Sequence, residues 1–184
     1  MDLNKNQSDF EELIDDGKSD HLKLFELPEI SLPNQEGNLL KLNRNDTFKI
    51  VLYCYPMTGR PDRILPKNWN NIKGASGCTA ETCSFRDKYD ELVSLNTVPI
   101  GLSTQSVEDL KEVSQRLCLP YDIVSDIDLE FANKLNLPTF KIDNKIYIKR
   151  ITLIIEKTSI KKVFYPVNSP KTHINEVLKW LKKN

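Results

Sequence analysis

The stretch GCTAETCSFRD, residues 77–87, begins the clearest helix that the 184-residue sequence predicts. From Phe85 onward, apolar and aromatic side chains recur at helical spacing. This spacing is typical of a helix that buries one face. We therefore expect a single helix over residues 78–95. The recurring positions are Phe85, Tyr89, Leu92 and Val93.

A long loop separates this helix from the strand before it. Residues 48–55, FKIVLYCY, are β-branched and aromatic, which predicts a buried strand that Pro56 ends. Residues 57–77 contain glycine and proline without periodicity, and compact domains rarely keep such a loop without a use. Because active sites in α/β sheets favour the carboxyl ends of strands, we expect the chemistry at this connection.

The rest of the pattern predicts an α/β fold with a central mixed β-sheet flanked by helices and an N-terminal β-hairpin. Residues 27–32 and 39–42 are short apolar stretches on either side of a turn, which favours the hairpin. The closing strand–strand–helix order makes the sheet mixed rather than fully parallel. The other expected elements are strands at 98–103, 123–124, 146–155 and 160–165, a helix to Leu117 capped by Ser106, a helix at 129–135 and a final helix from Pro170.

Composition and charge restrict the class of partner. The 26 Lys and Arg residues balance 26 Asp and Glu residues, which argues weakly against nucleic acid. Residues 1–20 carry seven acidic and two basic side chains, and residues 141–184 carry eleven basic and three acidic ones. We interpret these ends as solvated faces, with a basic docking face as the alternative. No apolar run approaches the roughly 20 residues of a membrane span, and no signal core follows the first residue, so we expect a cytoplasmic protein without a membrane partner.

Four cysteines without an export signal predict reduced thiols, which are more often catalytic or metal-binding than structural. Cys78 stands at the expected helix start, where free N–H groups and the helix dipole stabilise a thiolate. Cys83 points away from the apolar face. Because it follows Cys78 by five residues, the two Cα atoms lie roughly 8–9 Å apart in an intact helix. A disulfide needs less than about 7 Å. On spacing alone, a buried small hydrophobe and an incidental thiol explain the pair as well as a redox role does.

A metal site is not expected. The C-x2-C spacing is absent, and His21 and His173 are far away in sequence.

Residues 77–87 match the pattern G-C-T-x-E-x-C-x-F-R-D, and the strand before them ends in Tyr55-Pro56. These residues closely resemble the active-site segment of the peroxiredoxin family, nearest the peroxiredoxin Q or bacterioferritin-comigratory subgroup. The resemblance covers roughly residues 25–182. It implies a thioredoxin-like fold over residues 25–184, with a loop insertion at 57–77 and a polar N-terminal extension of residues 1–24.

The resemblance also implies the chemistry. Cys78 would be the peroxidatic cysteine of a thiol-dependent peroxidase, acting on hydrogen peroxide or an organic hydroperoxide. Cys83 would be the resolving cysteine, and thioredoxin or a similar dithiol would reduce the disulfide that they form. Arg150, just before an apolar strand, matches the arginine that the family places beside the reactive sulfur. No cofactor is implied, and we expect a monomer or a weak homodimer.

Two positions depart from the family pattern. The family has a threonine three residues before the reactive cysteine, where this chain has Ala75, and its proline lies much closer to that cysteine than Pro56 does. We interpret the difference as an insertion, with Pro56 as the family-like proline and Thr58 as the hydroxyl that binds peroxide. Ser76 is the alternative source of the hydroxyl.

Three other side chains leave alternatives open. Cys54 and Cys118 are expected to be small hydrophobes, with a resolving role for Cys118 as the rival to Cys83. Arg86 is either a second cation at the site or the partner of Asp90 in a helix-surface ion pair. Since Ala75 lacks a hydroxyl, the alternative function is a redox sensor or protein-binding module with little turnover.

Overall fold

The computed structural model describes residues 12–44 and 47–184, and a five-stranded sheet forms its centre. The strands are β3 (Lys49–Cys54), β4 (Thr97–Ser103), β5 (Ile123–Ser125), β8 (Ile151–Glu156) and β9 (Ser159–Phe164). Their order across the sheet is β5-β4-β3-β8-β9. β3, β4 and β5 are parallel, whereas β8 runs antiparallel to both β3 and β9. The predicted mixed sheet is therefore confirmed.

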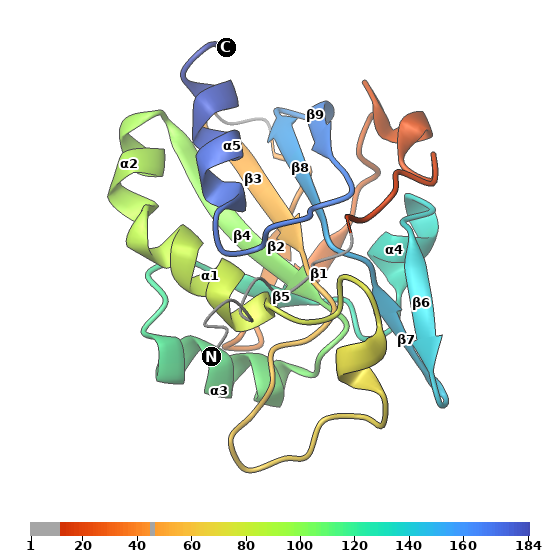
Figure 1. Ribbon diagram of the computed structural model, residues 1–184. Coiled ribbons are helices and arrows are strands. Elements are labelled where there is room, and N and C mark those ends of the chain that lie inside the picture. Colours follow the sequence, from red (N-terminus) through yellow and green to blue (C-terminus); the bar gives the residue numbers. More distant parts are fainter. Residues whose placement is uncertain (1–11, 45–46) are drawn as a thin grey trace, which may run out of the picture.

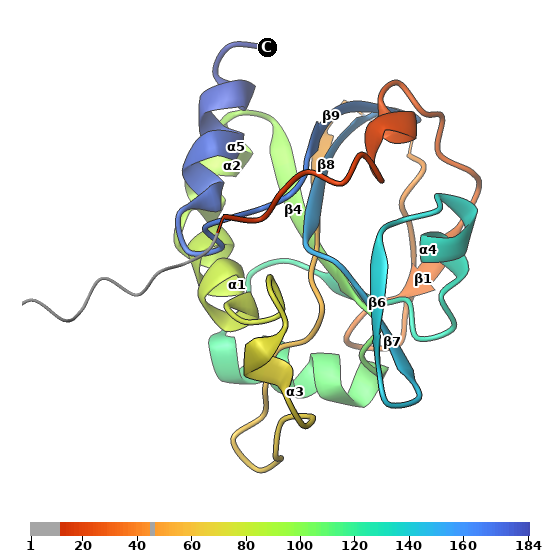
Figure 2. The same ribbon diagram turned by 45° about the vertical axis from the view of Figure 1, so that its right-hand side comes forward.

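The helices that matter for the site cover one face of this sheet. They are α1 (Cys78–Asp87), α2 (Tyr89–Ser94), α3 (Val107–Leu117) and α5 (His173–Leu181). Figure 2 shows α1, α2 and α5 on the same side of the sheet. Since side chains alternate along a strand, Val51 and Tyr53 of β3 pack under the helices, while Ile50 and Leu52 face the other layer.

The opposite face is covered by smaller elements. The predicted hairpin is present as β1 (Ser31–Pro33) paired antiparallel with β2 (Leu39–Lys41), beside the short helix α4 (Glu130–Lys134). The later part of the expected N-terminal extension also packs here. It forms a 3₁₀ turn at Asp20–Leu22, and Leu22 is fully buried in the core on this face. Residues 1–11 of that extension lie outside the described residues.

Two expected elements are interrupted. The single helix predicted over residues 78–95 is wrong, because the chain changes direction at Lys88 between α1 and α2. Leu92 stays buried after the break, but Val93 turns outward and is 40% exposed. The single strand predicted over 146–155 is also wrong.

The interruption of that strand lies between β7 (Lys145–Ile148) and β8. β7 pairs instead with β6 (Thr139–Ile142) in a separate two-stranded sheet. The Lys149 N–H donates to the carbonyl of Pro138, which lies opposite it in the register of β6 and β7, so this pairing extends one residue beyond β7. Arg150 therefore lies between the ends of the two strands.

The final helix begins at His173 rather than at Pro170, which belongs to the turn before it.

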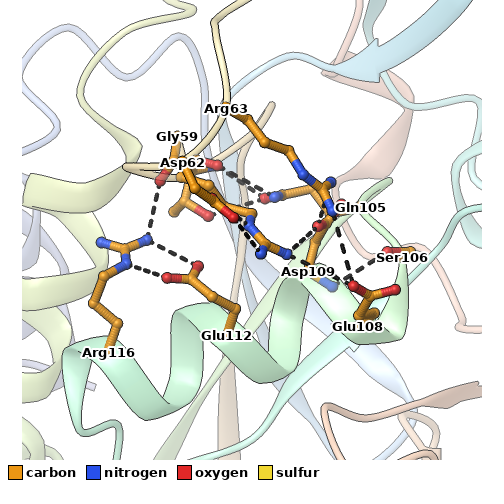
Figure 3. A network of polar contacts seen from close by, with 11 residues as sticks. Gly59, Asp62, Arg63, Gln105, Ser106, Glu108, Asp109, Glu112 and Arg116 are labelled. Carbon is orange, nitrogen blue, oxygen red and sulfur yellow. Dashed lines mark hydrogen bonds and ion pairs between the residues drawn. The ribbon is translucent and has the colours of Figure 1, made fainter.

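The long loop of residues 57–77 is held to the rest of the fold at several places. Figure 3 shows its first part tied to α3, where Arg116 donates to the Gly59 carbonyl at 3.0 Å and Arg63 pairs with Asp109 at 2.7 Å. Farther along, a 3₁₀ turn at Trp69–Asn71 buries the Trp69 ring against Tyr147 of β7. Trp69 therefore anchors this part of the loop to β7.

Candidate active site

The beginning of α1 is fixed by a glycine. Gly77 caps the helix with a φ of 98°, which is left-handed backbone that side-chain-bearing residues rarely adopt. A Cβ atom there would also lie 3.0 Å from the ring of Pro170, which precedes α5. The tight contact presses the end of the long loop against the α5 connection. It sets where Cys78, the first residue of α1, enters the core.

Cys78 is almost entirely enclosed, with 3% of its surface exposed. Its Sγ accepts a hydrogen bond from Nη2 of Arg150 at 3.2 Å and donates to the Ala75 carbonyl at 3.4 Å. The backbone N–H of Met57 also donates to this sulfur. Two donors from distant parts of the chain therefore converge on one thiol, as an anion at this sulfur requires.

Arg150 is itself held by a buried carboxylate. Glu81, one helical turn after Cys78, is fully buried and forms an ion pair with Nη1 of Arg150. The Nη2 group also donates to the carbonyls of Ser76 at 3.0 Å and Gly74 at 3.5 Å. These contacts fix the plane of the guanidinium and aim one of its edges at the sulfur.

Burial and the neighbouring charged partner act in opposite directions on the pKa values of Cys78, Glu81 and Arg150. Burial raises the pKa of the Cys78 thiol, while Arg150 and the Met57 N–H act to lower it. Burial likewise raises the pKa of Glu81 to about 7, against the lowering influence of Arg150. Burial opposes the charge on Arg150, but Cys78 and Glu81 together raise its pKa above the ordinary value. An ionised Cys78 sulfur therefore depends on Arg150 remaining charged beside it.

Pro56 and Thr58 lie on either side of Met57 in the segment that follows β3, and both are buried. The Thr58 hydroxyl donates to Oε1 of Gln105 at 3.0 Å, and the Thr58 N–H donates to the same oxygen at 2.9 Å. The Gln105 amide returns a bond to the Thr58 carbonyl at 3.2 Å. Gln105 thus holds the loop that presents Met57 to the sulfur. Ser76, the alternative hydroxyl, is exposed and faces Asn70 at 3.4 Å.

Cys83 lies on the same helix as Cys78, at the margin of the core between sheet and helices, and is partly exposed. All four cysteines are free thiols. Cys54 is fully buried in β3, and burial raises its pKa well above the ordinary value, as expected for an inert thiol. Cys118 is exposed at the end of α3.

Arg86 does not pair with Asp90. Its guanidinium bonds to Asp87 at 2.8 Å and to the Leu117 carbonyl at 2.8 Å. The alternative in which Arg86 pairs with Asp90 is therefore wrong, because the helix is interrupted at Lys88 between the two residues. Arg86 instead ties the end of α1 to the end of α3.

Three contributors to the site were not identified from the sequence. The Met57 N–H and the Gln105 side chain carry no sequence signal for this role. Glu81 did carry one. It lies three residues after Cys78 and four before Phe85, on the apolar face, where a carboxylate needs a buried cation.

Among the described residues, no group of three or more His, Cys, Asp or Glu side chains could hold a metal ion, and no helix is long and apolar enough to cross a membrane.

The comparisons with known proteins agree on one family. Residues 69–163 match the sequence model of the AhpC/TSA family. Peroxiredoxin Bcp of Escherichia coli strain K12 is 28% identical over 161 residues, covering 85% of this chain and 93% of that protein. The chloroplastic peroxiredoxin Q of Sedum lineare is 26% identical over 155 residues, covering 84% and 74%.

The fold has solved counterparts. The crystal structure of peroxidoxin BcpB from Mycobacterium tuberculosis superimposes with a TM-score of 0.72 at 22% identity, covering 88% of this chain and 96% of that one. The crystal structure of a cysteine-to-serine mutant of PrxQ from Xylella fastidiosa gives 0.68 at 20% identity, covering 87% and 96%. The thioredoxin-like fold that the sequence predicts is confirmed.

Proposed function

The chain belongs to the AhpC/TSA family, and on that premise we propose that it is a thiol-dependent peroxidase in which Cys78 attacks the peroxide. The observation that carries this assignment is the convergence of Arg150 and the Met57 N–H on the Cys78 sulfur inside a closed, apolar site. A cation and an amide stabilise the thiolate, which is the nucleophilic form of cysteine. The same donors stabilise charge that develops on the peroxide oxygens.

The reaction proceeds in three balanced steps. The Cys78 thiolate attacks one oxygen of the hydroperoxide, the O–O bond breaks, and water or an alcohol leaves as Cys78 becomes a sulfenic acid. The Cys83 thiol then attacks the Cys78 sulfur, and a disulfide forms with release of water. An external dithiol such as thioredoxin takes the disulfide by exchange, becomes oxidised, and restores both thiols.

The second step requires α1 to open. In an intact helix the two Cα atoms are roughly 8–9 Å apart, beyond the reach of a disulfide. The first turn and a half must therefore unwind. Tyr121 donates to the carbonyl of Thr82 at 2.9 Å, in the segment between the two cysteines. That bond is one contact that unwinding has to break and that refolding restores.

The functional test is a coupled assay with purified protein, thioredoxin, thioredoxin reductase and NADPH. Addition of hydrogen peroxide or cumene hydroperoxide is expected to consume NADPH in proportion to the peroxide supplied. Peptide mass spectrometry after one equivalent of peroxide is expected to recover a Cys78–Cys83 disulfide. A disulfide with no turnover on either peroxide and any dithiol would favour the redox-sensor alternative instead.

The proposal includes a role for Thr58 in binding the peroxide, beside Pro56. Because the Thr58 hydroxyl donates to Gln105, its lone pairs remain able to accept a hydrogen bond from the peroxide O–H. Thr58→Val is expected to lower kcat/KM for hydrogen peroxide about ten-fold, as the loss of one hydrogen bond does. Thr58→Ser keeps the hydroxyl and is the control. Equal rates for the valine and serine variants would contradict the role.

We also propose that the protein acts in the cytoplasm as a monomer or weak homodimer. Four unpaired cysteines, one of them exposed at Cys118, support a reducing compartment.

A further inference from the structure

Two buried tyrosines link the middle of α1 to the central sheet. The Tyr121 hydroxyl donates to the carbonyl of Thr82 at 2.9 Å, and the hydroxyl oxygens of Tyr53 and Tyr121 lie 2.9 Å apart. Because Tyr121 uses its proton on the carbonyl, Tyr53 is the donor between the two hydroxyls. Tyr53 belongs to β3 and is fully buried, while Tyr121 precedes β5 and is 7% exposed. Two hydrogen bonds in series therefore run from the sheet to the residue before Cys83.

Neighbouring residues leave room for these hydroxyls and orient them. Gly101 of β4 has no side chain here, and a Cβ atom there would lie 2.7 Å from the Tyr53 hydroxyl oxygen. The Tyr53 ring stacks on Phe85 of α1, with 4.3 Å between the ring centroids and 8° between the planes. The Tyr121 ring stacks on Tyr89 at the start of α2, with 6.1 Å between the centroids. Both rings are therefore held by aromatic contacts, which fix where their hydroxyls lie.

The Tyr121 hydroxyl takes no direct part in peroxide attack, but it opposes the step that follows. The donors to the Cys78 sulfur are Arg150 and the Met57 N–H, and they reach it while α1 is folded. The disulfide with Cys83, in contrast, requires α1 to unwind. Since the Tyr121 bond breaks when α1 unwinds, it favours the geometry of the first step over that of the second.

We propose that Tyr121 is a positioning residue whose hydroxyl holds α1 folded and so limits the rate at which Cys83 reaches the oxidised Cys78. The inference rests on the proposed peroxidase function. A sulfenic acid that waits for Cys83 remains open to a second molecule of hydrogen peroxide. One oxygen of that peroxide is transferred to the sulfur, which becomes a sulfinic acid, and the other leaves as water. Because dithiol exchange does not reverse this product, the Tyr121 bond sets how much peroxide the protein tolerates.

The kinetic test is Tyr121→Phe, which keeps the ring and removes the hydroxyl. By rapid quench and peptide mass spectrometry, conversion of the sulfenic acid into the Cys78–Cys83 disulfide is expected to be at least about five-fold faster, as the loss of one hydrogen bond allows. The hydrogen peroxide concentration that turns half of Cys78 into sulfinic acid during turnover should rise by the same factor. In the Cys83→Ser background, sulfenic acid formation should stay within about two-fold of the parent rate. Tyr89→Phe is the matched control, because the Tyr89 hydroxyl makes no hydrogen bond within the described part of the chain.

Amide hydrogen exchange of the reduced protein does not depend on turnover. Tyr121→Phe is expected to speed the exchange of the α1 amides at least about five-fold. Thr97→Val removes a hydroxyl bond to the Leu95 carbonyl, of 3.0 Å and outside α1, and should leave the α1 amides within about two-fold. Unchanged α1 exchange in Tyr121→Phe, equal acceleration by both variants, or an unchanged disulfide rate in a protein that consumes peroxide overturns the proposal. Faster α1 exchange in a protein that consumes no peroxide would sink the peroxidase function and leave the hold of Tyr121 on α1.

Discussion

Replacing Cys78 by serine is expected to abolish peroxide consumption, with a fall of at least about a thousand-fold in the coupled assay, because the proposed nucleophile is lost. The hydroxyl of serine does not ionise at neutral pH, and Arg150 and the Met57 N–H have no sulfur anion to stabilise. The exchange of sulfur for oxygen is nearly isosteric in a buried site. We therefore expect the thermal unfolding of the variant to stay close to that of the parent.

The other cysteines provide matched controls for this variant. Cys83→Ser is expected to consume one equivalent of peroxide and to stop as a sulfenic acid on Cys78, which a dimedone adduct reveals by mass spectrometry. Cys54→Ser tests a buried thiol that is remote from these roles and should retain turnover. Cys118→Ser tests the rival resolving cysteine. If Cys118→Ser stops the cycle and Cys83→Ser does not, the assignment of the resolving residue is wrong.

The sequence allowed the central sheet to be predicted because its strands carry local signals. β3 is a run of β-branched and aromatic residues, and α3 begins at Ser106, whose side chain caps the Asp109 N–H at 3.2 Å as the spacing predicts. Such elements are specified by residues within a few positions of each other. The pattern therefore shows them without knowledge of the rest of the chain.

The interruption of the expected strand could not be predicted, since contacts with other segments accompany it. The run from Ile146 to Ile155 has no breaker, yet the strand stops where Lys149 bonds to Pro138 and Arg150 turns into the core. A strand pattern shows which face a residue occupies, but not that a guanidinium in it reaches a sulfur 72 positions away.

The residues of the candidate site likewise fall into those that the sequence indicated and those that only the structure shows. Family resemblance pointed to Cys78 and Arg150, and the structure brings the two into contact. Met57 acts through its backbone N–H, whose presence does not depend on the side chain, so no residue pattern could reveal it. Glu81 lies on the buried face of its helix and pairs with Arg150 there. A carboxylate within a predicted apolar stripe indicates a buried cation, because an unpaired buried charge is costly.

The ion pair between Glu81 and Arg150 supports a prediction that separates stability from catalysis. Glu81→Leu is expected to lower the free energy of unfolding by about 3–5 kcal/mol, because it leaves the buried guanidinium without its carboxylate. Arg150→Met is expected to lower the rate of peroxide reduction by about 10²–10³-fold, as the loss of one preorganised donor does. Urea unfolding and peroxide consumption are the two measurements. As a control, Glu130→Leu removes an exposed helix pair with Lys134 and should change stability by no more than about 0.5 kcal/mol.

The double variant Glu81→Leu/Arg150→Met decides what the pair does. Replacing a buried ion pair by apolar side chains is often neutral for stability, so the double variant should recover most of the stability that Glu81→Leu loses. It should not recover the rate, because the Cys78 sulfur still lacks its cation. Recovery of the rate would mean that Arg150 does not act on the sulfur. A double variant as unstable as the sum of the single variants would mean that the two charges are not coupled. Recovered stability with a lost rate is the result expected if Glu81 serves to hold Arg150 in the core, and Arg150 serves the thiol.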